Sequence, residues 1–315
     1  MRTVSKELRT SFSGHEGFPF RYTWPKKAVD AVCKDPGVFD CDDAMVQLGV
    51  GKNMVKSIRH WSLRLGLVKV EESAETLRRG RKLKASTLGV NLLGSEGWDP
   101  YLEDPGTLWL LHWKLVSKPE AATTWWAAFN RYPGTQFTRQ NLQDHVEVLV
   151  KRSGGKCPAK NTLKRDIDVF IHTYVPPRST VVHKDKVAYQ DTLECPLVEL
   201  GLLRESSDEG AYQIVRGYHE TLPTKVFEYG LWEYLSRRRS QDGQAVTLEE
   251  LALDSGAPGR VFCLNEVGLL NRLEEITKKN QGIQVDETAG LKQVYVRDTS
   301  ISPQDCLGRY FAHVS

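Results

Sequence analysis

The sequence has no long uncharged apolar run, and its first residues lack the apolar core of an export signal. Its six cysteines are scattered and include no C-x-x-C pair, which is typical of reduced thiols in a chain of 315 residues. These absences argue against a membrane-spanning helix, a zinc finger and a disulfide scaffold. We expect a soluble cytoplasmic protein that makes no membrane contact.

Several catalytic signatures are missing as well. No Walker-type Gly-rich phosphate loop occurs, so we expect neither a nucleotide cofactor nor ATPase activity. The sequence contains no complete two-histidine metal nuclease pattern and no nucleophile triad. Sequence chemistry alone therefore does not establish an enzyme.

Charge is nearly balanced overall but unevenly distributed. The chain has 43 Lys+Arg and 40 Asp+Glu, a net charge of +3. Between Gly51 and Val90, ten basic residues stand against three acidic ones, so this stretch carries +7 and the rest carries −4. Such a local excess of positive charge is expected of a surface that binds nucleic acid.

Three segments show a helix-like run, then a Gly-Leu pair, then a strand-like stretch. They are centred on Gly66, Gly201 and Gly268. A glycine just past a helix end adopts the left-handed conformation that closes the helix, and the next apolar residue packs back on it. In winged-helix domains the recognition helix passes into the wing in this way. We predict three winged-helix-like elements, and only the first lies in dense positive charge.

The first element is the predicted DNA reader. A short helix over 44–48, a tight turn and a second helix ending at Leu65 form a helix-turn-helix with one apolar and one basic face. Strands at 67–70 and 81–85 follow, joined by a basic tip that suits phosphate or minor-groove contacts. The basic helix face suits the major groove, with Asn53 reading a base. The predicted DNA contacts are Lys52, Asn53, Lys56, Ser57, Arg59, His60, Arg64, Arg78, Arg79, Arg81, Lys82 and Lys84. The alternative is a solvated charged face on a helix that only packs.

The middle of the chain is rich in tryptophan. Five of the eight tryptophans lie between residues 98 and 126, the first of them inside a Gly/Pro/Asp-rich connection over 94–106 and the other four after it. Aromatic residues at i, i+4 spacing most often form a packed core or a protein interface. Base stacking is less favoured, because basic residues are not interleaved.

A second basic helix follows the tryptophan-rich stretch. Its apolar positions are predicted to be buried, which leaves Lys160, Lys164 and Arg165 on the outside as further candidate DNA contacts. The hairpin predicted over 202–215 turns at an acidic tip, Ser206 to Gly210, which is unsuited to phosphate.

The last third is predicted to be a winged-helix-like unit for protein contact or homodimer formation. A helix over 225–239 precedes Thr247 and Glu250, which fit a capping box. A helix from Pro258 to Val267 is then expected, followed by a hairpin over 282–296 with an acidic tip at Asp286-Glu287.

Together these patterns predict a mainly α protein with small β-hairpin wings, an α+β fold of several domains. Winged helix-turn-helix modules are expected to be joined by a Trp-rich helical middle region. We place a DNA-binding domain at 1–95, the middle domain with a second winged-like element at 96–220, and a C-terminal winged-helix-like domain at 221–315.

Two groups of residues are candidates for catalysis. His15, Glu16 and Arg21 could serve as general base, metal ligand and phosphate clamp. The favoured alternative is a structural loop held by its aromatic residues. The second group consists of Asp99, Glu103 and Asp104. These carboxylates could bind Mg²⁺ or Mn²⁺, or could simply form the turn before a helix.

Five segments carry a family resemblance, at residues 11–22, 48–61, 97–113, 161–166 and 191–196. They resemble a bacterial family long described as of unknown function. That family includes the DNA-nicking subunit of the Ssp systems, which place phosphorothioate on one DNA strand as part of antiphage defence. The resemblance covers nearly the whole chain.

The resemblance implies a nucleoid-associated bacterial endonuclease that nicks double-stranded DNA with a divalent metal. Its partners would be a cysteine desulfurase, an ATPase and a sulfur-transferring pyrophosphatase. It does not identify the residues that cut, and Gly17 stands where the family's His-Glu motif is expected to have Thr. Two alternatives stay open: a non-catalytic DNA-binding scaffold that recruits the modification proteins, and a winged-helix transcription regulator.

Overall fold

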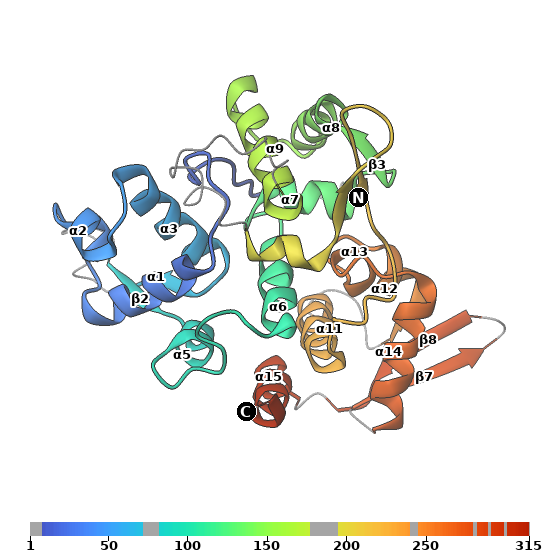
Figure 1. The fold of residues 1–315 in the computed structure, drawn as a ribbon. Helices are drawn as coiled ribbons and strands as arrows, with labels where there is room; N and C mark the ends of the chain where they lie inside the picture. Colours follow the sequence, from blue (N-terminus) through green and yellow to red (C-terminus); the bar gives the residue numbers. More distant parts are fainter. Residues whose placement is uncertain are drawn as a thin grey trace.

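The fold is known from a computed structural model, which describes residues 8–71, 82–176, 195–239, 245–279, 282–288, 291–298 and 301–314. It is a mixed α/β fold, mainly helical with small antiparallel sheets (Figure 1). Among the described helices, none has the length and apolar character needed to cross a membrane.

The N-terminal elements form a helical group with one hairpin. They are α1 (Thr23–Lys34), η1 (Val38–Asp40), α2 (Ala44–Leu48), α3 (Lys52–Arg64), β1 (Val68–Val70), β2 (Leu83–Ala85) and α5 (Thr87–Leu93). Gly49 (φ 63°) ends α2, and Gly66 (φ 70°) follows α3 and leads into β1, as the sequence predicted. The strands β1 and β2 pair antiparallel, so the predicted hairpin is confirmed.

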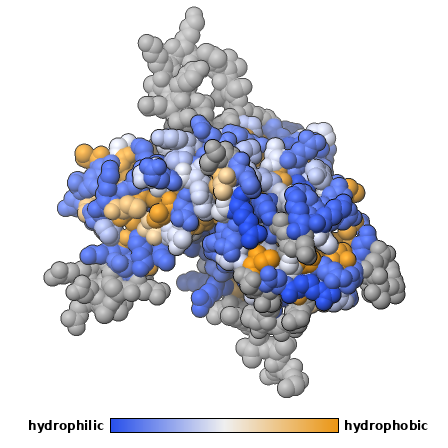
Figure 2. All heavy atoms as spheres, turned by 90° about the horizontal axis from the view of Figure 1, so that it is seen from below, coloured by the Kyte–Doolittle hydropathy of each residue, from blue (hydrophilic) through white to orange (hydrophobic). Residues whose placement is uncertain are grey.

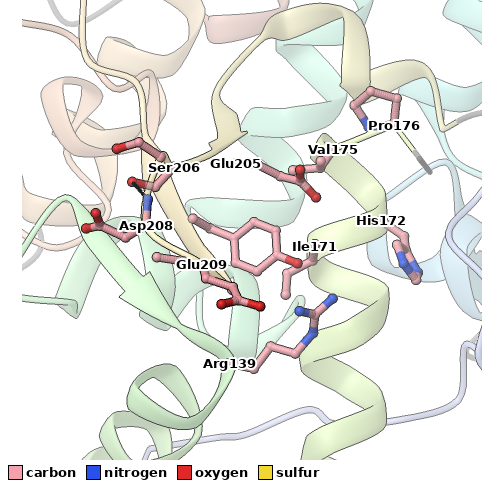
Figure 3. Close-up of a pocket in the computed structure, with 13 residues that line it drawn as sticks. Arg139, Ile171, His172, Val175, Pro176, Glu205, Ser206, Asp208 and Glu209 are labelled. Atoms are coloured by element: carbon pink, nitrogen blue, oxygen red, sulfur yellow. Dashed lines mark hydrogen bonds between the residues drawn. The ribbon is translucent and has the colours of Figure 1, made fainter. Parts of the chain in front are cut away.

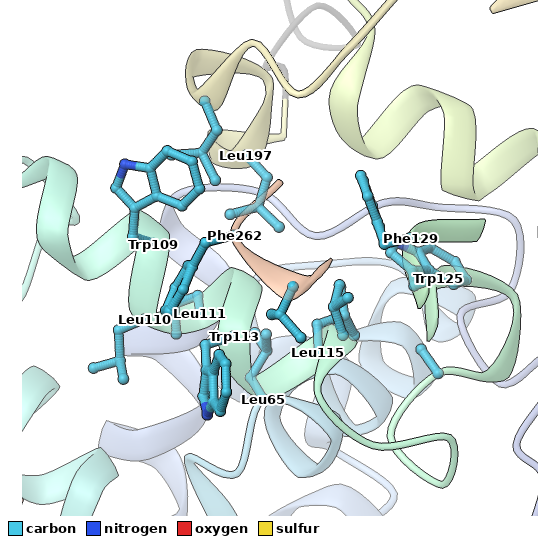
Figure 4. Close-up of a cluster of buried hydrophobic side chains, with 14 of the residues drawn as sticks. Leu65, Trp109, Leu110, Leu111, Trp113, Leu115, Trp125, Phe129, Leu197 and Phe262 are labelled. Carbon is cyan, nitrogen blue, oxygen red and sulfur yellow. The ribbon is translucent and has the colours of Figure 1, made fainter. Parts of the chain in front are cut away.

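The tryptophan-rich stretch forms the centre of the molecule. Its elements are α6 (Pro105–Val116), α7 (Thr123–Trp126) and the π-helical turn η2 (Ala127–Arg131). Helix α6 is buried on nearly all sides, as expected of a helix that is apolar all round. Trp113 stacks on Phe262, with ring centroids 5.0 Å apart and an interplanar angle of 26° (Figure 4). Aromatic packing, favoured over base stacking, is confirmed for this stretch.

Two later units share one connectivity, in which a strand is followed by helices and a hairpin. The first comprises β3 (Gln136–Thr138), α8 (Arg139–Arg152), α9 (Lys160–Tyr174), η3 (Pro196–Leu200), β4 (Leu203–Glu205) and β5 (Ala211–Ile214). The second comprises β6 (Ala245–Thr247), α12 (Leu248–Leu253), α13 (Pro258–Val261), α14 (Glu266–Lys278), β7 (Ile283–Thr288) and β8 (Leu291–Val296). In each unit the opening strand pairs with the last, in the orders β3-β5-β4 and β6-β8-β7.

The third Gly-Leu segment was predicted wrongly. Gly268 does not end a helix: it lies in the first turn of α14, and the Asn265 side chain caps this helix by accepting the Gly268 N–H at 2.8 Å. The predicted helix from Pro258 to Val267 is therefore two helices, with Cys263 at a positive φ of 50° between them. An asparagine is a strong helix N-cap, and this local signal outweighs the Gly-Leu pattern.

The predicted position of the acidic hairpin tip was also wrong. Asp286 lies inside β7, where its register partner is Gln293 of β8. By contrast, the capping box of Thr247 and Glu250 at the start of α12 is confirmed.

One hydrophobic cluster of the described residues extends from Phe20 to Phe311. Helix α15 (Pro303–Val314) packs beside α11 (Thr224–Arg239), and its Phe311 stacks on Trp98 at 5.0 Å. Figure 2 shows a largely hydrophilic face with a few separate apolar patches. The domain boundaries near residues 95 and 220 stay a prediction.

Candidate nucleic-acid interface

Helix α3 has one buried and one basic face, as its spacing predicted. Val55, Ile58 and Trp61 are buried against the core. Lys52 and Lys56 are exposed, and neither belongs to the apolar stripe. Asn53 is also exposed and Arg59 is half-buried. The helix therefore presents cationic and amide side chains to solvent along its first two turns.

Ser57 is a correction to the predicted set of DNA contacts. Its side chain is fully buried, and its hydroxyl donates to the His15 carbonyl oxygen at 3.0 Å. Ser57 precedes Trp61 by one helical turn, so the two residues share the buried face. The hydroxyl is therefore used inside the protein and does not reach the surface.

His60 and Arg64 are less available than Lys52 and Lys56. Burial, together with the nearby Arg64, His15 and Arg59, lowers the pKa of His60 to about 3, so its ring is neutral at pH 7 and adds no positive charge. Arg64 donates to the backbone oxygen of Glu120 at 3.0 Å. It is half-buried at the C-terminal end of α3.

The N-terminal loop at residues 8–22 contacts both α3 and α9. A buried His–Asp contact holds it to α9. His15 is 2% exposed, and its Nε2 lies 2.9 Å from Asp166 Oδ1 on α9. The same carboxylate accepts the Ser13 N–H at 2.8 Å and the Thr124 hydroxyl. Because Ser57 of α3 binds the carbonyl of His15, one loop residue is held by both helices.

The hydrogen bonds of His15 favour the structural interpretation of this loop over a general base. Its Nδ1 accepts the Gly17 N–H at 3.1 Å, which assigns the ring proton to Nε2, facing Asp166. Both ring nitrogens are therefore engaged within the protein. Gly14 (φ 88°) allows the close packing, because a Cβ there would lie 2.4 Å from His60 Nδ1.

The other two candidates in this loop lie nearer the surface. Glu16 has a positive φ of 51°, and its Oε1 lies 3.8 Å from Lys56 Nζ. The Arg21 guanidinium lies over the Trp24 ring, 5.4 Å from the centroid.

Helix α9 supplies a second set of exposed bases. Lys160, Lys164 and Arg165 are exposed, while Leu163 and Ile167 are buried, as predicted. Arg165 lies next to the loop, since a Cβ on Gly17 would be 4.0 Å from its Cδ. Figure 1 shows the loop running between α3 and α9. The two basic helices are thus linked through one short segment.

The first hairpin adds exposed lysines beside α3. Lys69 of β1 and Lys84 of β2 are direct cross-strand partners and are both exposed. Lys82 is exposed just before β2. The predicted contacts Arg78, Arg79 and Arg81 lie outside the described residues.

The candidate metal ligands have other roles within the fold. Both oxygens of Asp99 accept backbone N–H groups, from Glu103 at 2.9 Å and Asp104 at 3.0 Å. Asp104 caps α6 by accepting the Gly106 N–H at 2.7 Å, and it also accepts the Tyr310 hydroxyl. Within the described ranges no group of three or more His, Cys, Asp or Glu residues could hold a metal ion, and a metal at Asp99, Glu103 and Asp104 stays a prediction.

The acidic tip of the β4–β5 hairpin lines a cavity of about 620 Å³. Figure 3 shows Glu205, Asp208 and Glu209 around it, together with Arg139. Arg139 Nε lies 2.9 Å from Asp168 Oδ1, so its charge is already paired. The acidic lining agrees with the expectation that this hairpin does not meet phosphate.

Comparison with known proteins connects this chain to one family. Residues 12–311 match the family described as "Protein of unknown function (DUF4007)". No curated protein matches the sequence. The crystal structure of SspB is 30% identical with a TM-score of 0.85, and the match covers 98% of this chain and 90% of SspB.

A magnesium-bound crystal structure of SspB is similar to the same degree. It is 29% identical with a TM-score of 0.85, and the match covers 100% of this chain and 91% of that one. Nearly the whole fold is therefore shared, including α3, α9 and the loop between them. The chain belongs to the DUF4007 family and is SspB-like over almost its entire length.

Proposed function

We propose that the protein binds duplex DNA and nicks it as the SspB-like component of a DNA phosphorothioate modification system. The observation that carries this proposal is the 30% identity to SspB over 98% of the chain. A cysteine desulfurase, an ATPase and a sulfur-transferring pyrophosphatase would be its partners in that system. Their reactions would supply the sulfur that enters the nicked strand.

DNA binding would use the basic surface formed by α3, the first hairpin and α9. Exposed Lys52 and Lys56 on α3 and Lys164 on α9 would contact phosphates, and Asn53 would reach a base edge. The connectivity of the two later units, with an opening strand, helices and a hairpin, supports their assignment as winged-helix modules. The helix-turn-helix of α2 and α3 followed by a hairpin would be the DNA-reading module.

Strand cleavage would use a divalent metal ion. Magnesium is present in one crystal structure of SspB. In this chain Asp99 and Asp104 accept hydrogen bonds from backbone amides. Phosphates of the DNA supply ligands in many magnesium sites, which usually need only one or two protein carboxylates.

A supercoiled-plasmid assay separates nickase from scaffold. The purified chain is incubated with plasmid in Mg²⁺, in Mn²⁺ and in EDTA, alone and together with the candidate partners. Nicked circles that require the metal support the proposal. Shifted but uncut plasmid under every condition would instead identify a DNA-binding scaffold.

Matched variants connect that activity to this chain. A Lys52→Ala/Lys56→Ala variant should nick less at limiting protein concentration, because it binds the plasmid more weakly. The control is Lys278→Ala/Lys279→Ala on α14, which removes the same charge from lysines already paired with Glu274 and Glu275. Equal loss in both variants would point to a general charge effect, and unchanged nicking by both would point to a contaminating nuclease.

A further inference from the structure

A cavity of about 500 Å³ lies at the C-terminal end of α3, where segments far apart in the sequence meet. Its walls come from α3 and β1, from the start of α5, from α6 and the turn after it, and from α15. Four of the described lining residues are basic and one is acidic. The basic residues are Arg64, Lys69, Lys114 and Lys118, and the acidic one is Glu120.

One of the four cations is neutralised inside the protein. Lys114 Nζ lies 2.6 Å from Glu233 Oε1 and 4.8 Å from the Tyr229 ring centroid. Glu233 also accepts the Trp113 indole N–H and the Tyr229 hydroxyl, both at 2.7 Å. Despite burial, which acts to raise it, the pKa of Glu233 is lowered to about 2 by Lys114 and these donors. This carboxylate is therefore already used.

The other three cations have no carboxylate partner among the described residues. Arg64 donates to a neutral acceptor, the Glu120 backbone oxygen, and its burial lowers the pKa of the guanidinium. Burial lowers the pKa of Lys114, and the nearby positive charge of Lys118 lowers it further. With Glu120 the one acidic residue among the described lining, the cavity wall thus carries a net positive charge in a partly desolvated place, where an anion gains more than in bulk water.

The charges of the first hairpin also favour an anion at this cavity. Lys69, which lines the cavity, is directly opposite Lys84 in the β1–β2 register. Like charges directly opposite each other in an antiparallel pair are destabilising. A bound anion would relieve that repulsion.

We propose that this cavity binds a phosphate group of nucleic acid, held by Arg64, Lys69 and Lys118. The inference rests on the proposed function, because it extends the same DNA surface. Arg64 stands 12 residues after Lys52 on α3, a distance of about 18 Å at about 1.5 Å per residue. That span equals about five base pairs at about 3.4 Å each. One duplex lying along α3 can therefore reach both ends of the helix.

The phosphate could be an internal diester of an unbroken strand or the terminal 5′-phosphate at a nick. Both present the same oxyanion to the same three cations. A terminal monoester carries more negative charge, close to two units at pH 7. The test therefore includes probes that differ only at this point.

The test measures DNA binding by fluorescence anisotropy, with three labelled duplexes of one sequence. They are an intact duplex, a duplex with a central nick carrying a 5′-phosphate, and a duplex with the same nick carrying a 5′-hydroxyl. Binding by the full chain is measured at several salt concentrations. The variant is Lys69→Ala/Lys118→Ala, and the control is Lys278→Ala/Lys279→Ala.

Each phosphate contact contributes about 0.9 to the slope of log K against log salt. We expect the Lys69→Ala/Lys118→Ala variant to lose about one to two units of slope and at least about tenfold in affinity at low salt. An equal loss on all three probes identifies an internal diester. A loss confined to the 5′-phosphate nick identifies a terminal phosphate.

Two outcomes overturn the inference, and they are distinct. If the cavity variant matches wild type on every probe while Lys52→Ala/Lys56→Ala binds weakly, the DNA surface stands and the cavity has no part in it. If wild type binds none of the probes at low salt, the proposed function fails and this inference fails with it. A circular dichroism melt confirms that each variant is folded.

Discussion

His15 Nε2 lies 2.9 Å from Asp166 Oδ1, and this buried contact joins residues 151 positions apart in the chain. It fixes the N-terminal loop to α9, while Ser57 fixes the same loop to α3. A buried polar network therefore fixes the positions of the two basic helices relative to each other. Such a network rigidifies a site when all its members are satisfied.

Substitutions of Asp166 distinguish a structural pair from a catalytic one. Asp166→Ala leaves the His15 ring N–H and the Thr124 hydroxyl buried without their acceptor, each costing about 1–3 kcal/mol. We expect the free energy of unfolding in urea to fall by at least about 2 kcal/mol. Asp166→Asn keeps an oxygen that can occupy the Oδ1 position, so it should be milder.

The nicking activity of the Asp166→Asn variant tests whether the pair acts in catalysis. Our account predicts nicking within a few-fold of wild type per folded molecule, because His15 does not take a proton from substrate. A folded Asp166→Asn protein with nicking reduced a hundredfold or more would show that the pair acts in catalysis.

Ser57→Ala tests whether this residue supports the loop or reads DNA. The substitution removes the donor to the His15 carbonyl, so we expect a loss of about 1 kcal/mol in stability. Preference among DNA sequences, measured by competition binding, should not change. A changed preference at unchanged stability would return Ser57 to the set of base contacts.

Stability should depend on pH through His60. Its folded-state pKa of about 3 lies below the ordinary value of 6.5. Between these values the unfolded chain binds the proton and the folded chain does not, so stability is complete above about pH 6.5 and falls as the pH drops towards 3. His60 contributes about 1.4 kcal/mol per pH unit in that window.

His60→Gln isolates this contribution. Urea unfolding at pH 5.0 and pH 7.5 should show a smaller loss of stability at the lower pH in the variant than in wild type. Identical pH dependence in the two proteins would mean that His60 is not buried as a neutral ring.

Substitutions in the acidic turn before α6 distinguish a helix-capping side chain from a metal ligand. Asp104→Ala removes the side chain that accepts the Gly106 N–H, and loss of a helix N-cap costs about 1 kcal/mol. Glu103→Gln should leave the melting temperature unchanged. Neither change should alter the Mg²⁺ concentration needed for half-maximal nicking, and a rise in that concentration in both variants would place the metal at this turn.

Local signals account for the parts of the fold that were predicted correctly. The apolar stripe of α3, the left-handed Gly66 and Gly201, and the capping box at Thr247 each depend on residues within one or two turns of the chain. The same local logic explains the error at Gly268, where the Asn265 cap was the stronger signal. Ser57 was misassigned because its hydroxyl binds a loop 42 residues away.

The site depends on contacts that no local pattern reveals. Nothing in the spacing of residues 13–22 points to Asp166, since the partner lies on a helix distant in sequence. The exposure of Lys69 opposite Lys84 could have been read from the predicted hairpin register. Lys118 lines the cavity only because the turn after α6 lies near the end of α3 and near β1, which is a tertiary arrangement.

The salt dependence of duplex binding by wild type and by the Lys52→Ala/Lys56→Ala/Arg59→Ala variant shows whether α3 binds DNA. All three substitutions are on the solvent side of α3 and favour helix, so the fold should persist. We predict that the variant binds at least about tenfold more weakly at low salt, with a slope reduced by about one to three units. Equal affinity and equal slope in the two proteins would contradict the assignment of α3 as the DNA-binding helix.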